Sequence, residues 1–328
     1  MTQSVNVAAC VLTMAGCAPG TSATEKDTAG DSDTDTPGAP NDTADTADTA
    51  DSGEPPPRAL STGTHTLAHG GMERTFRLYL PEDLPEGAPL IIAMHGYTSS
   101  AATLQSYAGL DARAETHGFA VVYPQGTRDR YGNNYWEVGY DFHDGSVDDV
   151  GFIRALAAYI DADQGLGPIY ATGMSNGGDM SYRLACEASD LVTAVAPVAG
   201  CMMGWLAEAC TPATPVPVLE IHGTDDDVTL WEGDPDNRGG WGPYLSTEDG
   251  IAVHVALHGL DSYEEEALPD SDSGDRSTVL ARRWTRSDSD KAVWLYEVQG
   301  GGHDWPGAFG NQDIHASDVL WTFLSQYR

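Results

Sequence analysis

The amino-acid sequence predicts an α/β sandwich, with a mainly parallel central sheet and helices on both faces. Two observations support this fold class. Continuous apolar runs such as residues 90–94 alternate with amphipathic segments such as residues 148–162. A strand buried on both faces has no polar side, and parallel strands need a crossover, usually a helix. The alternation covers the chain after residue 58, so we expect one domain over residues 59–328.

The expected elements follow in chain order. Residues 63–80 alternate apolar and polar side chains, as in an antiparallel hairpin with one buried face. Apolar runs predict strands at residues 90–94, 119–123, 169–174, 194–198, 216–221 and 292–298. Helices are expected between and after these strands, at residues 101–116, 148–162, 179–188, 246–257 and 314–327.

The N-terminal part of the chain has a different composition. Residues 1–16 carry no charged side chain and lead to Met14-Ala15-Gly16-Cys17, which is similar to a bacterial lipoprotein signal. We therefore expect a signal segment over residues 1–17 and a lipid on Cys17. The protein would then be exported, and either extracellular or anchored at the cell surface or in the periplasm. The segment lacks the Lys or Arg of an ordinary signal peptide, so a chance cysteine is the alternative.

Residues 18–58 repeat the tripeptide D-T-A and close with three prolines. This acidic tract has almost no large apolar side chain, so it cannot bury enough surface to offset chain entropy. We expect a disordered linker.

The net charge restricts the partners. The chain has 50 acidic and 16 basic residues, a formal charge of -34. A surface this acidic repels phosphate backbones, which argues against nucleic acid as a partner. No apolar run reaches 18 residues, so we expect membrane contact only through a lipid on Cys17. We expect a monomer.

The pentapeptide Gly173-Met174-Ser175-Asn176-Gly177 fits G-x-S-x-G between an expected strand and an expected helix. That context is typical of a nucleophile elbow, where a Cβ on either glycine would collide with neighbouring backbone. Ser175 is therefore the candidate nucleophile. Because short motifs arise by chance, a glycine-rich helix start with a bystander serine is the alternative.

A candidate acid follows the strand at residues 216–221, in the sequence H-G-T-D-D-D-V. The spacing H-G-x-x-D selects Asp226, and we expect Asp225 and Asp227 to be turn or surface carboxylates. Three carboxylates could also bind Ca²⁺, but the ligand spacing of a known calcium loop is absent.

The candidate base is His303, which follows three glycines after the last expected strand. Such a loop lets an imidazole reach both nucleophile and acid. The order Ser175, Asp226, His303 is that of α/β-hydrolases. In that fold the oxyanion hole would use the backbone N–H groups of Tyr97 and Asn176. We expect His95 to brace the loop rather than to act as a base.

Three cysteines remain in the domain, so at most one internal disulfide can form. Cys201 with Cys210 closes the shortest loop, and Cys186 with Cys210 is the rival.

Four tryptophans fall in loops, where exposed aromatic rings near a hydrolase site commonly stack on substrate. We take Trp136 and Trp231 as candidate substrate-binding residues, with local packing as the alternative. Trp241 is a further aromatic near the site, and Trp305 is expected to brace the His303 loop.

The motifs H-G-Y-T-S-S, V-D-D-V-G-F-I-R-A-L, G-M-S-N-G-G, A-V-A-P-V-A-G, V-P-V-L-E-I-H-G-T and G-G-G-H-D-W-P-G resemble the bacterial polyhydroxybutyrate depolymerase and feruloyl esterase family of secreted α/β-hydrolases. The resemblance covers about residues 63–328. It implies an extracellular serine esterase acting on polyhydroxybutyrate, or on feruloyl or acetyl esters of xylan, or on their oligomers. Tyr97 stands where many members have Cys, and residues 233–244 form an insertion.

The mechanism that follows is attack by Ser175 on an ester carbonyl, formation of an acyl-enzyme and its hydrolysis by water. It needs no cofactor and no metal. A serine peptidase on the same fold and a non-catalytic surface binding module are the alternatives.

Overall fold

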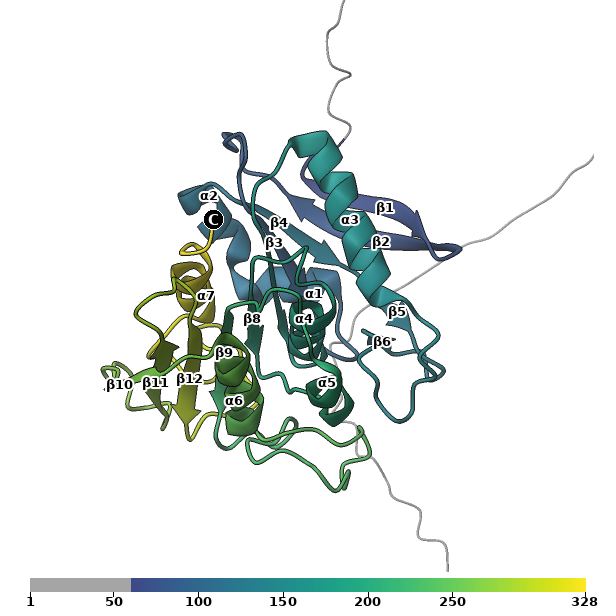
Figure 1. Cartoon of the computed structure of the whole chain (residues 1–328). Coiled ribbons are helices and arrows are strands. Elements are labelled where there is room, and N and C mark those ends of the chain that lie inside the picture. Colours follow the sequence, from purple (N-terminus) through teal and green to yellow (C-terminus); the bar gives the residue numbers. More distant parts are fainter. Residues whose placement is uncertain (1–59) are drawn as a thin grey trace, which may run out of the picture. The chain divides into compact units, whose positions relative to one another are not determined.

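The centre of the molecule is a ten-stranded sheet in the computed structural model, which describes residues 60–328 (Figure 1). The strand order is β1-β2-β4-β3-β7-β8-β9-β12-β11-β10. The six strands from β4 to β12 are parallel, and antiparallel strands flank them on both sides. The bounds are β1 (Gly63–His69), β2 (Met72–Tyr79), β3 (Leu90–Met94), β4 (Ala120–Pro124), β7 (Ile169–Met174), β8 (Ala194–Val198), β9 (Val218–Gly223), β10 (Ser262–Ala267), β11 (Thr278–Thr285) and β12 (Val293–Gln299).

Helices cover both faces of this sheet (Figure 1). Along β3, Leu90 and Ile92 pack into one core while Ile91 and Ala93 pack into the other, as the two-residue period of a strand requires. The first core also contains residues of α3 (Asp149–Gln164), α4 (Asn176–Glu187), α5 (Gly204–Ala209) and α6 (Thr247–His258). The second core contains residues of α1 (Ala101–Ala108), α2 (Leu110–His117) and α7 (Ala316–Leu324).

The predicted fold class is confirmed, and each predicted strand is present within a few residues. The helix expected at residues 101–116 is two helices, because Gly109 adopts a left-handed conformation with φ 67° between them. The helix expected from residue 179 begins at Asn176. The sequence patterns missed α5, β10 and β11, and the small sheet formed by β5 (Thr127–Arg128) and β6 (Asn134–Tyr135).

One disulfide joins Cys186 to Cys210, with Cα atoms 5.0 Å apart. Of the two pairings left open by the sequence, the longer loop is the one that closes. Cys186 near the end of α4 and Cys210 after α5 are both buried in the first core. Cys201 is a free thiol, and its backbone N–H donates to Oδ1 of Asp179 at 2.7 Å. Cys201 therefore lies with α4 beside the site described below.

The signal segment at residues 1–17, its Cys17 and the linker at residues 18–58 lie outside the described residues. Across residues 60–328, none of the helices combines the length and the apolar character needed to cross a bilayer.

Candidate active site

Ser175 occupies a sharp turn between β7 and α4. Its φ of 56° is unusual for a residue with a side chain, and such strain is found where the surrounding structure enforces it. A Cβ at Gly173 would lie 2.4 Å from the backbone carbon of Gly177, and a Cβ at Gly177 would lie 2.0 Å from the carbonyl oxygen of Met94. Both glycines are therefore required by close backbone packing, as the elbow interpretation predicts.

Asp226 and His303 come together from loops that are 77 residues apart in the sequence. The imidazole Nδ1 of His303 lies 2.7 Å from Oδ2 of Asp226. Oδ1 of Asp226 accepts hydrogen bonds from the backbone N–H groups of Val228 and Thr229, both at 2.8 Å. Because Nδ1 of His303 contacts Asp226, its other ring nitrogen, Nε2, is the one available to the serine.

The neighbouring carboxylates differ from Asp226 in their exposure. Asp226 is buried, whereas Asp225 and Asp227 are exposed on either side of it. The spacing argument therefore selects the one carboxylate of the three that is held inside the fold. In residues 60–328, no group of three or more His, Cys, Asp or Glu side chains is arranged to hold a metal ion.

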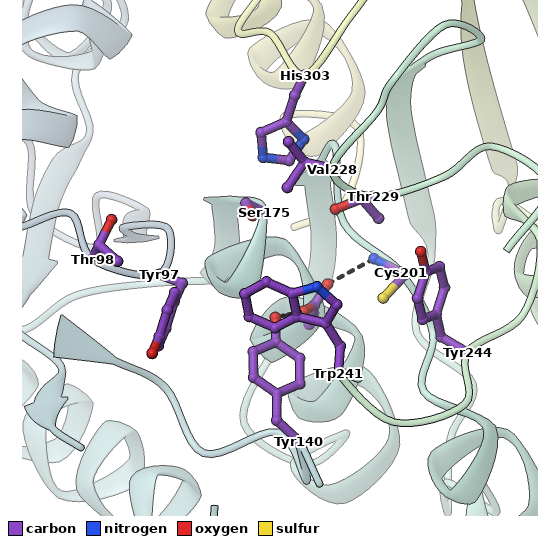
Figure 2. Close-up of a pocket in the computed structure, with 11 residues that line it drawn as sticks. Tyr97, Thr98, Tyr140, Ser175, Cys201, Val228, Thr229, Trp241, Tyr244 and His303 are labelled. Atoms are coloured by element: carbon purple, nitrogen blue, oxygen red, sulfur yellow. Dashed lines mark hydrogen bonds between the residues drawn. The ribbon is translucent and has the colours of Figure 1, made fainter. Parts of the chain in front are cut away.

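Ser175 and His303 line the same cavity, which has a volume of about 250 Å³. Figure 2 shows the imidazole of His303 above Ser175, with aromatic rings on the opposite side. The lining residues come from loops at the carboxyl ends of the parallel strands and from α4. They are Tyr97, Thr98, Tyr140, Ser175, Asp179, Cys201, Val228, Thr229, Trp241, Tyr244 and His303.

Trp136 is fully buried and does not line this cavity. Its indole N–H donates to the backbone oxygen of His95 at 2.9 Å. Its backbone exchanges two hydrogen bonds with the Asn176 side-chain amide, at 2.7 and 3.1 Å. The expected substrate contact is therefore corrected: Trp136 ties the loop after β3 to the start of α4.

The other tryptophans also differ in their surroundings. Trp231 is half-buried, packs near the His222 ring with centroids 6.0 Å apart, and is not among the cavity-lining residues. Trp241, from the loop at residues 233–244, lines the cavity (Figure 2). Trp305 is buried two residues after His303, where it anchors that loop.

His95 is a buried, neutral imidazole. Its Nδ1 lies 2.8 Å from the backbone oxygen of Gly96, and its Nε2 accepts the backbone N–H of Gly126 at 3.0 Å. Burial lowers the pKa of His95 to about 4. Both ring nitrogens are used to hold the loop, so His95 has the bracing role expected from the sequence.

A second buried imidazole lies beneath the Asp226 carboxylate, and sequence reasoning missed it. His222 Nδ1 is 3.1 Å from Oε1 of Glu220, and its Nε2 is 2.8 Å from the backbone oxygen of Thr229 and 3.5 Å from Oδ2 of Asp226. Burial alone would lower the pKa of His222, but the hydrogen bond and charge of Glu220 raise it. The motif H-G-T contained this residue without indicating its partner.

Asp179 was also missed. It lies one helical turn after Ser175, is 3 % exposed, and lines the cavity. Tyr140 donates its hydroxyl to Oδ2 at 2.6 Å, and the Cys201 N–H donates to Oδ1 at 2.7 Å; Figure 2 marks both bonds. Burial raises the pKa of Asp179 to about 6. Nothing in the sequence sets it apart, because acidic side chains are common in the first turn of a helix.

Comparison with known proteins identifies the family. Residues 74–258 match the family model described as Esterase PHB depolymerase. The chain belongs to this family. The putative esterase NocK of Nocardia uniformis subsp. tsuyamanensis is 32 % identical over 83 % of this chain and 81 % of its own length.

Two further relatives carry more specific names. The probable feruloyl esterase C of Aspergillus niger is 27 % identical, over 79 % of this chain and 87 % of that protein. The poly(3-hydroxyalkanoate) depolymerase C of Paucimonas lemoignei is 30 % identical, over 56 % of this chain and 43 % of that protein. As a member of the Esterase PHB depolymerase family, the chain is a carboxylic ester hydrolase.

Solved structures agree on the fold. The acetyl xylan esterase from Aspergillus awamori superposes with a TM-score of 0.58, at 15 % identity, over 80 % of this chain and 99 % of that chain. The chain therefore has the α/β-hydrolase fold.

Proposed function

We propose that this esterase uses Ser175 as nucleophile, His303 as general base and Asp226 as the acid that orients the imidazole. The observation that carries the proposal is the 2.7 Å contact between His303 Nδ1 and Asp226 Oδ2. His303 lines the same cavity as Ser175, which lies in a strained turn. His303 takes the hydroxyl proton as Ser175 attacks the ester carbonyl, and returns it to the leaving alcohol. Water then hydrolyses the acyl-enzyme.

The oxyanion of the tetrahedral intermediate would be held by the backbone N–H groups of Tyr97 and Asn176. Asn176 is the first residue of α4, where backbone N–H groups lack an acceptor within the helix. Among residues 60–328, the Tyr97 N–H donates to no backbone acceptor. Both donors belong to segments that Trp136 ties together, so the hole is preorganised before substrate arrives.

The proposed substrate is a carboxylic ester on a polymer or on its oligomers. Relatives bearing the names poly(3-hydroxyalkanoate) depolymerase, feruloyl esterase and acetylxylan esterase support this class. A cavity of about 250 Å³ has room for one acyl group and not for a polymer chain. The rest of the substrate would therefore lie outside the cavity.

The test is to compare the wild type with Ser175→Ala. We expect the wild type to react with a fluorophosphonate probe and to hydrolyse at least one of methyl ferulate, acetylated xylan, hydroxybutyrate oligomers and p-nitrophenyl acetate. Ser175→Ala should lose both properties while its circular dichroism spectrum is unchanged. Hydrolysis at the wild-type rate by Ser175→Ala would refute the assignment of the nucleophile.

We further propose that the enzyme is exported and carries a lipid on Cys17, with residues 18–58 as a tether between membrane and domain. The sequence Met14-Ala15-Gly16-Cys17 and the acidic composition of the tether support this. Cys17→Ser should shift the enzyme from the membrane fraction to the soluble fraction, or stop its maturation. A mature N-terminus at another residue, found by mass spectrometry, would refute the anchor.

A further inference from the structure

Asp179 is a charged side chain in a cavity whose described lining contains no Lys or Arg. Its hydrogen-bond donors, the Tyr140 hydroxyl and the N–H and thiol of Cys201, are all neutral. Burying a carboxylate without a cationic partner is costly, and an apolar side chain in this position would suit a plain alkyl pocket better. The carboxylate therefore needs an explanation beyond packing.

The groups around Asp179 do not supply that explanation. Tyr140 faces it from the loop after β6, and Cys201 from the loop after β8. Burial raises the pKa of the Tyr140 hydroxyl and of the Cys201 thiol well above their usual values, so both stay neutral. Glu220 on β9 has the same sign of charge and raises the pKa of Asp179 further. None of these three groups carries a positive charge that would balance the Asp179 carboxylate.

The carboxylate can accept more hydrogen bonds than it receives. It accepts bonds from the Tyr140 hydroxyl and from the N–H and the thiol of Cys201, whereas an ionised carboxylate has about four lone-pair sites. The unfilled capacity belongs to a side chain that lines the cavity, one helical turn from Ser175. A hydrogen-bond donor on a molecule bound in the cavity would use the remaining acceptor capacity of Asp179.

We propose that Asp179 is a specificity-determining residue, which accepts a hydrogen bond from a hydroxyl or ammonium group on the part of the ester that fills the cavity. This rests on the proposed function of the same site. Aromatic walls around the cavity support this proposal, because aromatic faces can hold both a flat acyl group and a cation. These walls are formed by Tyr97, Tyr140, Trp241 and Tyr244 (Figure 2). The enzyme thus selects esters that carry a donor over apolar esters of the same shape.

The experiment compares kcat/KM for matched ethyl esters. Pentanoate, 4-hydroxybutyrate and 4-aminobutyrate differ only in whether the chain ends in methyl, hydroxyl or ammonium. Cinnamate and 4-hydroxycinnamate differ only in one phenol hydroxyl. We expect the wild type to prefer a donor-bearing ester roughly 10- to 100-fold, the range for a hydrogen bond to a charged group. Asp179→Leu should reduce that ratio to about one or below, whereas the same change at an exposed carboxylate outside the cavity, Asp190→Leu, should keep it.

The dependence of the same ratio on pH separates the two donors. The Asp179 carboxyl is ionised above a pH of about 6 and neutral below it. The preference for the ammonium ester should therefore fall as the pH is lowered through 6, while a preference for a hydroxyl should largely remain. Any effect of pH on the chemical step is common to both esters of a pair and cancels in the ratio. Asp179→Leu removes this dependence, which distinguishes Asp179 from Glu220.

Two results would overturn the inference and leave the proposed function standing. One is a wild-type ratio near one for every pair, and the other is a preference that persists in Asp179→Leu. If the folded wild type hydrolyses none of these esters or those named above, the proposed function and this inference both fail. If Asp179→Leu does not fold, Asp179→Asn and the wild-type pH profile decide in its place.

Discussion

The free energy of unfolding of Asp179→Asn, measured relative to that of wild type, should increase as the pH rises. The folded-state pKa of Asp179 is raised by burial from 3.8 to about 6. A group whose pKa is raised by folding contributes stability that is complete below its unfolded pKa and is lost as the pH rises through the folded one. The wild type therefore loses this contribution between about pH 4 and pH 6, and Asn, which does not titrate, loses nothing.

The size of the effect follows from the same pKa change. At 1.36 kcal/mol per unit of pKa the whole titration is worth about 3 kcal/mol, and the free energy of unfolding of Asp179→Asn should gain about 2 kcal/mol of this on that of wild type between pH 4 and pH 7. The loss of a hydrogen bond lowers the free energy of unfolding of Asp179→Asn by about 1 kcal/mol at every pH. In this variant the Asn oxygen can still accept from the Cys201 N–H, but the Tyr140 hydroxyl loses its acceptor.

The assay is urea unfolding of both proteins at several pH values from 4.5 to 7.5, with the disulfide intact. Asp190→Asn is a control of opposite sign. The hydrogen bonds from Arg154 lower the pKa of the exposed Asp190 carboxyl to about 2. That variant should lose stability relative to wild type as the pH rises, by a smaller amount that salt reduces. A difference between wild type and Asp179→Asn that is constant across pH would refute the reasoning.

Three further predictions follow from the site and its supports. Asp226→Asn should lower kcat by roughly 10⁴ through loss of imidazole orientation, whereas Asp227→Asn should change it less than threefold; steady-state kinetics decides which carboxylate acts. Trp136→Phe leaves the buried carbonyl of His95 without its donor, so kcat should fall about tenfold with little change in KM, and unfolding should become easier by about 2 kcal/mol. Replacing both Cys186 and Cys210 by Ser should cost about 3 kcal/mol in denaturant unfolding, because the bridge closes a loop with a sequence separation of 24.

The sequence was most informative where burial is continuous. Every residue of β3, β4 and β8 is buried, so an apolar run alone identifies these strands. By contrast, β10 has the sequence S-Y-E-E-E-A and all six of its residues are exposed. Its strand conformation comes from pairing with β11, where Arg283 lies opposite Glu264 and forms an ion pair with Glu266. Such an edge strand leaves no hydrophobic pattern in the sequence.

The site residues divide along a similar line. Ser175 is held by local glycines, and Asp226 and His303 each come within four residues of the end of a strand, so chain position was enough to propose them as candidates. Trp136 was misjudged because its burial depends on partners about 40 residues away in the sequence, which no local pattern contains.

Asp179 could not have been selected from the sequence for a further reason. In isolation it is a polar residue in the first turn of a helix, a position that favours acidic side chains in any protein. It becomes exceptional only when the loops that carry Tyr140, Cys201 and Trp241 enclose it with Ser175. The fold then holds a carboxylate in a place where an apolar residue would cost less. Asp179 is thus ordinary for its position in a helix but costs stability in the folded protein. A residue that binds substrate is expected to show this combination, and the specificity proposal and the stability prediction both rest on it.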